Sequence, residues 1–430
     1  MSATEPPSGP SAEQNAWLRA NAAAVGSIDI DERDFSDFAP IARALDAARL
    51  VLLGEPSHGD GVSFRAKARL VRFLHEELGF DVLAWEAGML DCEVMDRALA
   101  SGAGAAEAAA LGLFPIWSRS AEIQSLFGYA AGARAAGRPM SMAGIDCQSS
   151  ALGADRQSDE VLARFQRVAP GQLSADDGQA LRAGLRGLEA VASAAVAGPE
   201  AAAGRQAEPA AADLEPLLRR LKRQLDAAAP LPSVDAAHVQ RLLDNLLLHA
   251  LDVRDLLAAV TDEQAMRVLQ EGNDRRDRAM ADNLLWLAEQ RYPGRKIVVW
   301  AANSHIARAS FQVPGLQWRP MGEHLAARLG SAVYSLGFTA YQGTAGLCIG
   351  GDRWPVGPSS DGSLESALHG LRQEHAFLDL RAGRHQAGPG WLCGPIPGKP
   401  FGYAEVTACW PDLFDGLFFS DRMEPSAPLG

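Results

Sequence analysis

The sequence lacks a long hydrophobic run, and its first residues lack the features of a targeting signal. No segment reaches the roughly 18 consecutive apolar residues that a transmembrane helix needs, so no membrane span is predicted. Residues 1–14 contain neither a basic stretch nor an apolar core, which argues against a secretory signal peptide. We expect them to form a short disordered lead-in, and we expect no association with membranes.

Cysteine is scarce, with five residues scattered along the 430-residue chain and no C-x-x-C pair. An odd number of isolated cysteines fits neither a disulfide framework nor a structural zinc site. Because reduced thiols are typical of a reducing compartment, we expect a cytoplasmic protein.

Positive charge is in deficit, because 40 lysines and arginines face 53 aspartates and glutamates, for a net charge of −13. A dedicated nucleic-acid-binding protein needs a basic face to neutralise phosphates, so nucleic acid is not an expected partner. The expected partner is a small-molecule substrate, and the charge balance predicts no oligomeric state.

Several catalytic motifs are also missing. There is no G-x-S-x-G nucleophile elbow, and Ser57 directly precedes His58, which is poor geometry for a serine–histidine pair. The sequence contains no Walker-type phosphate loop and no G-x-G-x-x-G after a strand. We therefore predict neither a covalent serine mechanism nor any cofactor.

What remains is the composition of a globular protein, with 47% hydrophobic and 22% charged residues. Short apolar runs at 49–54 and 80–85 predict buried strands, and the periodic segment 64–78 between them predicts a helix. Further strands are expected at 139–146 and 296–301. This alternation predicts an α/β fold with a mostly parallel central sheet flanked by helices, and a ligand site at the carboxyl ends of its strands.

Residues 155–265 differ from the rest because they are rich in Ala, Leu, Arg and Glu and poor in strand formers. They predict a helical lobe inserted into a single domain that spans residues 15–430, with a low-complexity linker at 195–209. Helices are also expected over 15–48, 121–136 and 273–290. Late strands are expected at 332–338, 346–349, 376–380, 401–407 and 417–419.

Titratable side chains follow the first two predicted strands. Glu55 and His58 come directly after the strand at 49–54, and Glu86 follows the strand at 80–85. Burying such groups is costly unless they are paired, and we expect the two strand ends to be neighbours. A histidine held near neutrality by two carboxylates is a suitable general base, which favours catalysis over a structural salt bridge.

A third strand end carries Asn303 and His305, which we expect on the same edge of the sheet. Taken alone, His305 is more typical of a hydrogen-bonded structural histidine. Arg276, on the predicted helix 273–290, could hold an oxyanion or a carboxylate. Lys67 could reach the site only if its helix leans in that direction.

A divalent metal bound by Glu55, His58, Glu86 and His305 is an alternative use of the same residues. The E-x-x-H spacing lies on a loop here, whereas metal-binding histidines are aligned when such a motif lies on a helix. We therefore predict no metal site.

Together these motifs resemble the erythromycin esterase-like family, which includes macrolide esterases and succinoglycan biosynthesis-type homologues. The pattern in that family is a strand ending in G-E-x-[ST]-H-G, a helix with K-x-R-L, then G-F and a strand ending in Glu. The resemblance covers residues 40–410 apart from the alanine-rich linker. The matching residues are Gly54, Glu55, Ser57, His58, Gly59, Lys67, Arg69, Leu70, Gly79, Phe80, Glu86, Trp117, Glu122, Gly144, Asp146, Arg276 through Asn283, Met321, Gly322, Tyr334, Gly337 and Phe338.

The resemblance implies a hydrolase of an ester or lactone that needs no metal. In that family a histidine like His58 activates water as a general base, and carboxylates like Glu55 and Glu86 position the base and the water. We add His305 to this catalytic group. The resemblance also implies an open cleft with the helical lobe as one wall. Substrate binding is assigned to Lys67, Trp117, Glu122, Arg276 and Asn303.

One departure from the family concerns the substrate. Where the family often has W-A-H-N-x-H, this sequence has Ala302 in place of the first histidine and retains His305. The segment after His58 is one residue longer than usual and has Ser63 where an acidic residue is common. Both changes argue against macrolides, the antibiotics after which the family is named, as the substrate.

Two other functions stay open. The same polar cleft suits elimination, lactonisation or acyl transfer in a biosynthetic pathway, because a base and two carboxylates can transfer protons as well as activate water. A ligand-sequestering protein without turnover is the third alternative, with Ala302 as the sign of a decayed site. The retained Glu55, His58 and Glu86 favour catalysis.

Overall fold

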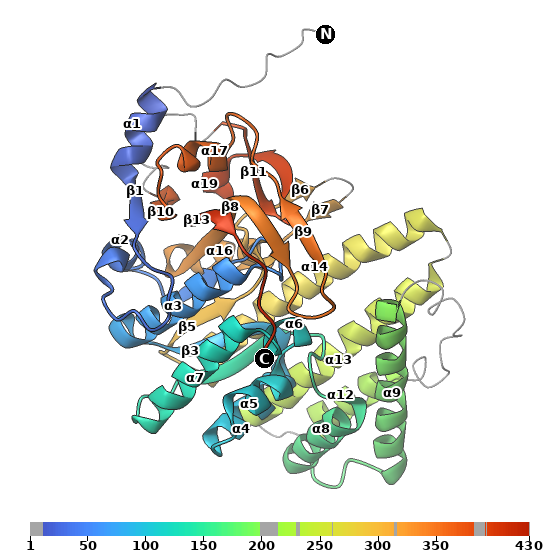
Figure 1. Cartoon of the computed structure of the whole chain (residues 1–430). Helices are drawn as coiled ribbons and strands as arrows, with labels where there is room; N and C mark the ends of the chain where they lie inside the picture. Colours follow the sequence, from blue (N-terminus) through green and yellow to red (C-terminus); the bar gives the residue numbers. More distant parts are fainter. Residues whose placement is uncertain are drawn as a thin grey trace.

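The computed structural model arranges the chain around one large sheet (Figure 1). The expected lead-in at 1–14 and the expected linker at 195–209 lie mainly outside the residues that the structure describes. No helix among the described residues is both long and apolar enough to cross a membrane. The described residues are 12–197, 214–228, 233–259, 261–313, 316–381, 392 and 394–429.

Six parallel strands form the middle of the sheet, in the order β13-β8-β2-β5-β3-β4. Several of them are short apolar runs, as expected for strands covered by helices on both faces. The predicted α/β fold with a mostly parallel central sheet is confirmed. The strands are β2 (Leu50–Leu53), β3 (Phe80–Gly88), β4 (Ser141–Asp146), β5 (Lys296–Trp300), β8 (Val333–Gly346) and β13 (Gly416–Met423).

Antiparallel strands extend the sheet beyond β13. β10 (His375–Asp379) pairs with β13, β1 (Ala22–Val25) pairs with β10, and β9 (Arg353–Val356) pairs with the last residues of β8. The segment 15–48 was expected to be helical with an acidic turn at 29–37, and the helix is wrong at 22–25, because β1 completes the sheet edge although its alanines have a low strand propensity. Two hairpins are separate from this sheet: β6 (Phe311–Val313) with β7 (Leu316–Trp318), and β11 (Ile396–Phe401) with β12 (Ala404–Ala408).

Alternation of side chains along the strands separates two hydrophobic layers. In β2, Leu50 and Leu52 belong to one layer, whereas Val51 and Leu53 belong to the other. The first layer is completed by helices α13, α14 and α16, and the second by α3 and α7. The bounds are α3 (Gly61–Leu78), α7 (Ala121–Ala135), α13 (Val234–Ala258), α14 (Asp262–Trp286) and α16 (Met321–Leu329).

The helical lobe lies beside the sheet, and its expected end at about 265 falls within helix α14. Helix α14 begins at the capping box of Thr261 and Gln264, and runs without a break from the lobe onto the sheet. The predicted start of this helix at 273 is therefore wrong. The lobe contains α8 (Ala154–Val168), α9 (Ala175–Ala197), α12 (Leu214–Ala228) and α13.

The remaining helical segments are mostly short and connect the strands. They are α1 (Ala12–Asn21), η1 (Ser36–Phe38), α2 (Ala39–Ala44), α4 (Met89–Ala100), α5 (Ala105–Gly112), α6 (Pro115–Ser118), η2 (Leu287–Arg291), α15 (Asn303–Ile306), η3 (Gly330–Ala332), α17 (Leu364–His369) and α19 (Trp410–Leu413).

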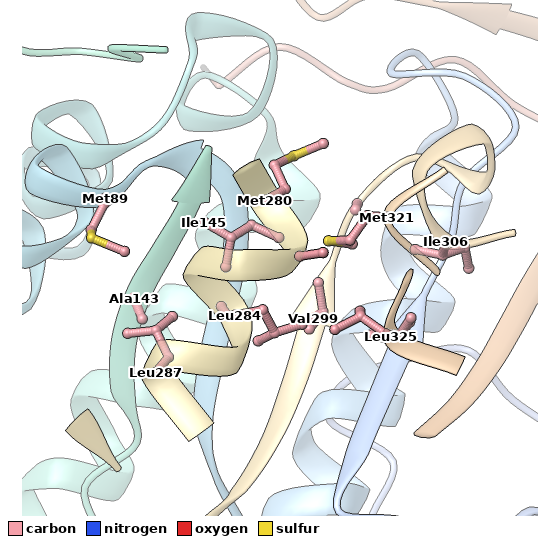
Figure 2. Packing of buried hydrophobic residues seen from close by; sticks show 14 of the residues in the cluster. Met89, Ala143, Ile145, Met280, Leu284, Leu287, Val299, Ile306, Met321 and Leu325 are labelled. Carbon is pink, nitrogen blue, oxygen red and sulfur yellow. The ribbon is translucent and has the colours of Figure 1, made fainter. Parts of the chain in front are cut away.

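Helix α14 lies against the sheet through an apolar face. Met280 and Leu284 pack with Ile145 of β4 and Val299 of β5, and Figure 2 shows how these side chains interlock. The two α14 residues are one turn apart and therefore point the same way. This packing fixes the helix so that Arg276, one turn before Met280, lies at the carboxyl ends of the strands.

Two of the predicted late strands differ from the structure. The segment 346–349 contributes only Gly346 to β8, and the chain then turns. The segment 401–407 is interrupted at Gly402 and Tyr403, both with φ of 63°, so a hairpin forms in place of one strand. The other three late strands correspond to β8, β10 and β13 and are confirmed.

Candidate active site

The carboxyl ends of β2, β5 and β3 lie side by side and supply most polar residues of the site. The expectation that β2 and β3 are neighbours is wrong, because β5 lies between them and pairs with both. The backbone after β5 connects the two outer strand ends. The amide of Asn303 donates to the carbonyl of Glu55 at 2.9 Å, and the amide of Ala302 donates to the Glu86 carboxylate at 2.8 Å.

The Asn303 side chain fixes the backbone around the site. Its amide nitrogen donates to the carbonyls of Phe338 and Pro400, both at 2.7 Å, and its oxygen accepts from the Phe338 amide at 3.0 Å. A Cβ at Gly54 would lie 1.9 Å from that oxygen, so this position requires glycine. Asn303 was expected to bind substrate, but its side-chain hydrogen bonds all go to backbone.

His58 lies on the loop after β2 and pairs with Glu55 of the same loop. Its Nδ1 lies 2.9 Å from Oε1 of Glu55, while Nε2 makes no hydrogen bond with any described residue. The His58 side chain is 36% exposed, whereas that of Glu55 is fully buried. Desolvation works to lower the pKa of His58, but the hydrogen bond to Glu55 and the charges of Glu86 and Glu55 raise it above its usual value.

Two buried groups hold the Glu55 carboxylate from behind. Lys67 of α3 donates to Oε2 at 2.7 Å, and the indole N–H of Trp117 donates to Oε1 at 3.2 Å. The Lys67 ammonium also lies 4.1 Å from the centre of the Trp300 ring. Desolvation lowers the pKa of Lys67 to about 8 although Glu55 opposes this. Lys67 and Trp117 were expected to contact substrate, and the structure places both against Glu55.

Glu86 is the centre of a second polar cluster. Its Oε1 lies 3.1 Å from Nη2 of Arg276 and 3.2 Å from Nε2 of His305, while Oε2 accepts from the Ala302 amide. Burial works to raise the pKa of Glu86, but His305, His58 and Arg276 hold it well below its usual range. Glu86 is therefore a permanent negative charge at neutral pH.

His305 is enclosed between two carboxylates. Its Nδ1 lies 2.8 Å from Oδ1 of Asp277 on α14, and Nε2 faces Glu86, so both ring nitrogens are engaged. Desolvation works to lower the pKa of His305, but Asp277 and Glu86 raise it to about 10. Asp277 is itself held by the indole N–H of Trp318 at 3.0 Å and the amide of Met321 at 2.8 Å. His305 is therefore protonated at neutral pH.

Arg276 bridges the ends of β3 and β4. Its Nε and Nη2 donate to the Asp146 carboxylate, at 3.0 and 2.5 Å, and Nη2 also donates to Glu86. The side chain is 17% exposed, and its Nη1 lies 3.5 Å from Nε2 of His305. The adjacent Arg275 pairs with Asp252 of α13 at 2.6 Å.

The two clusters together hold one more fixed negative charge than positive charge. Protonation of His58 would neutralise this excess negative charge. The pKa of His58 is raised for this reason, mainly by Glu55 and Glu86. The site can therefore bind a proton reversibly at His58. The carboxylates are Glu55, Glu86, Asp146 and Asp277, and the cations are Lys67, Arg276 and His305.

Asp60 shapes the loop that carries His58. Its carboxylate accepts from the amide of Ser57 at 2.9 Å and from the Ser57 hydroxyl at 3.0 Å. Asp60 is fully buried, and burial raises its pKa to about 7 despite these hydrogen bonds. The longer segment after His58 therefore contains a residue, Asp60, that stabilises the loop.

Residues 424–429, here called the strap, cross the His58 loop from the other end of the chain. The amide of Ser426 donates to the carbonyls of Gly59 and Gly346, at 3.1 and 3.0 Å. Glu122 accepts from the Ser426 hydroxyl at 3.3 Å and from the Ala427 amide at 3.2 Å. Glu122 was expected to bind substrate, but its contacts anchor the strap.

The sequence reading did not assign Asp146 and Asp277 to the site. Asp146 ends an apolar strand, as Glu86 does, so the same rule applied to β4 would have found it. Asp277 follows Arg276 by one residue and points about 100° away around the helix, toward His305. Periodicity does not tell which residue of a charged run faces the sheet.

The four residues considered as metal ligands are mostly engaged with other groups. Glu55 is bound by Lys67, while Glu86 and His305 bind each other and further charged partners. Within the part of the chain that the structure describes, no group of three or more His, Cys, Asp or Glu side chains is arranged to hold a metal ion.

Comparison with known proteins adds an independent line of evidence. The model of a family described as Erythromycin esterase matches residues 75–423. YbfO of Bacillus subtilis (strain 168) is 25% identical over 433 residues, which cover 95% of this chain and 91% of YbfO. Erythromycin esterase type II of Escherichia coli is 25% identical over 370 residues, which cover 81% of this chain and 84% of that protein.

A solved structure shares the fold. Erythromycin esterase EreC, as a mutant in its open conformation, has a TM-score of 0.71 at 18% identity and covers 95% of this chain and 99% of its own. The family match includes Glu86, Arg276 and His305 but begins after His58. It spans most of the chain and supports a hydrolase. The chain belongs to the erythromycin esterase family.

Proposed function

We propose that this protein hydrolyses an ester or lactone, with His58 as the general base that activates water and without a covalent enzyme intermediate. The observation that carries the proposal is the His58–Glu55 pair. Nδ1 lies against a buried carboxylate, while Nε2 belongs to a partly exposed ring and has no hydrogen-bond partner among the described residues. This contact favours the tautomer with a proton on Nδ1, so Nε2 can accept a proton.

The reaction follows from this arrangement. Neutral His58 accepts a proton from water at Nε2 as the water oxygen adds to the carbonyl carbon. The imidazolium then returns the proton to the departing alkoxide, so that one water is consumed and an acid and an alcohol form. Glu55 stabilises the imidazolium between these steps. General-base assistance of this kind is worth about 10²–10⁴-fold in rate.

Arg276 is the group best suited to bind the negative oxygen of the tetrahedral intermediate. It is partly exposed, and its ion pairs with Asp146 and Glu86 hold it in place before substrate arrives. A donor that is already fixed stabilises developing charge without reorganisation. His305 is only 3% exposed, so its role in this proposal is to hold Glu86 and to supply a positive charge.

The exposed part of α14 supports a substrate with a large apolar portion. Leu269 and Met266 are each 45% exposed on this helix, which extends beyond the sheet (Figure 1). Leu269 lies two turns before Arg276 on the same face of the helix, a distance of about 10 Å along the axis. We propose that an apolar part of the substrate reaches this far from the bond that is cleaved.

The test is a panel of esters and lactones, including macrolides and long-chain p-nitrophenyl esters, incubated in water enriched in heavy oxygen. Hydrolysis adds one water to the substrate mass and places one heavy oxygen in the product acid. His58→Ala should abolish this product. The matched control His369→Ala removes a half-exposed histidine on α17 and should retain activity. Undiminished hydrolysis by His58→Ala would contradict the proposal.

The same mass measurement separates the other two functions. Elimination removes the elements of an acid or of water from the substrate, and acyl transfer joins the acyl group to a second molecule. A sequestering protein would bind a member of the panel tightly and return it intact after long incubation.

A further inference from the structure

A polar pocket lies at the C-terminal end of α14, away from Arg276. Its volume is about 250 Å³, and residues of α4, α8, α13, α14 and η2 line it. Trp286, which forms part of its wall, is ten residues from Arg276, or about 15 Å along the helix. None of the groups assigned to hydrolysis lines this pocket.

Positive charge is concentrated there. Four arginines line the pocket against Glu93 and Asp235, and Glu160 beside it pairs with both Arg97 and Arg164, which leaves a net charge of one positive. In a chain with a net charge of −13, such a concentration favours a bound anion. The arginines are Arg97 of α4, Arg164 and Arg167 of α8, and Arg291 of η2.

Two of these arginines are free to bind a ligand. Arg164 is only 7% exposed and is fixed by an ion pair with Glu93 at 3.0 Å. Arg167 and Arg291 are exposed, and neither forms an ion pair with a described residue. Guanidinium groups bind phosphate oxygens in a two-pronged geometry, which suits these two side chains.

The rest of the wall is rigid and compatible with an anion. His238 stacks on Trp286 with ring centres 5.1 Å apart and an angle of 16°, and its Nε2 lies 3.0 Å from Glu93. Val234 and Asp235 belong to the first turn of α13, and the positive end of a helix dipole favours anions.

We propose that this pocket binds the phosphate group of a small phosphorylated molecule. A phosphate monoester presents three strong acceptor oxygens, which can engage the guanidinium groups of both Arg167 and Arg291, whereas a carboxylate presents two. The volume corresponds to about eight water molecules, since each occupies about 30 Å³ in the liquid, so it also admits a small organic part. The bound molecule connects α8 of the lobe to η2 beside the sheet.

The test is calorimetric titration of the full-length protein with inorganic phosphate and with pyrophosphate, at constant ionic strength. We expect saturable binding, tighter for pyrophosphate, and a rise in the unfolding temperature when the ligand is present. Arg167→Gln combined with Arg291→Gln should weaken binding at least about tenfold and remove the temperature rise.

The matched control is Arg156→Gln combined with Arg223→Gln. Both arginines are exposed on the lobe, neither lines the pocket, and the net charge changes by the same amount. This control should bind like the unmodified protein. Absence of saturable binding, or equal weakening in both double variants, would overturn the proposal. Tighter binding of citrate than of pyrophosphate would overturn the assignment to phosphate.

Discussion

The candidate active site contains two histidine groups that are built in the same way. In each, a carboxylate faces Nδ1 of the histidine and also accepts the N–H of a tryptophan, and the tryptophan ring packs edge-on against the histidine ring. The ring centres are 5.1 Å apart in the first group and 5.5 Å in the second. The groups are His58, Glu55 and Trp117, and His305, Asp277 and Trp318.

The groups differ at the other ring nitrogen. Nε2 of His58 has no partner among the described residues and its side chain is 36% exposed, whereas Nε2 of His305 faces Glu86 and its side chain is 4% exposed. Contacts at Nδ1 alone therefore do not decide the role of a histidine. A single further carboxylate at Nε2 outweighs the loss of solvent, which by itself favours the neutral ring, and turns a reversible base into a permanent cation.

The largest expected effect is the loss of catalytic rate when the proposed base, His58, is replaced. His58→Gln should lower kcat/KM for the ester identified by the panel by about 10²–10⁴-fold, because the proton acceptor is lost. Its free energy of unfolding should change by less than about 1 kcal/mol, since the side chain is partly exposed. Chemical denaturation and steady-state kinetics check both values. A large loss of stability with retained activity would mean that His58 has the structural role expected for His305.

His305→Gln should show the opposite pattern. It leaves Glu86 and Asp277 without their shared cation and should cost about 3–5 kcal/mol of unfolding free energy. The folded-state pKa of about 10 lies above the unfolded value, so the stabilisation is fully present below about pH 6.5 and is lost as the pH rises toward 10. Thermal unfolding from pH 6 to 10 should reveal a decline that the variant lacks.

A smaller effect should follow from Lys67→Met. Removing this cation makes the surroundings of His58 more negative, so its pKa should rise further. Because the base works when neutral, kcat/KM rises with pH through the His58 pKa, and this rise should move to higher pH. Lys67→Arg keeps the charge and serves as the control. A shift to lower pH would contradict the charge balance described for the site.

The smallest expected effects come from the two tryptophans. Trp117→Phe removes a donor from Glu55, so the pH profile of kcat/KM should move upward by a few tenths of a unit. Trp318→Phe removes a donor from Asp277 and should cost about 1 kcal/mol of stability without moving the profile. If both variants shifted the pH profile of kcat/KM equally, protonation of the two histidine groups would be coupled.

The sequence alone led to the strand ends that carry the site. Glu55, Glu86 and His305 each follow an apolar run, and that signal is local. The position of β5 between β2 and β3 was not accessible, because strand order depends on pairings between segments far apart in the chain.

The side chains around those strand ends were harder to place. Trp117, Glu122 and Asn303 were recognised as part of the pattern, but their contacts were not. Their partners lie on the His58 loop, the strap and β8 or β11, so the partners' positions depend on the completed fold. Local patterns therefore predicted which residues gather at the site better than what each of them touches.

The strap has a consequence for the order in which the protein is made. His58 and Glu55 leave the ribosome early, but one backbone partner of their loop is Ser426, and β13 precedes it in the middle of the sheet. A nascent chain therefore carries His58 on an unfinished loop throughout most of translation. If His58 acts as proposed, turnover begins only after residues 416–429 have emerged.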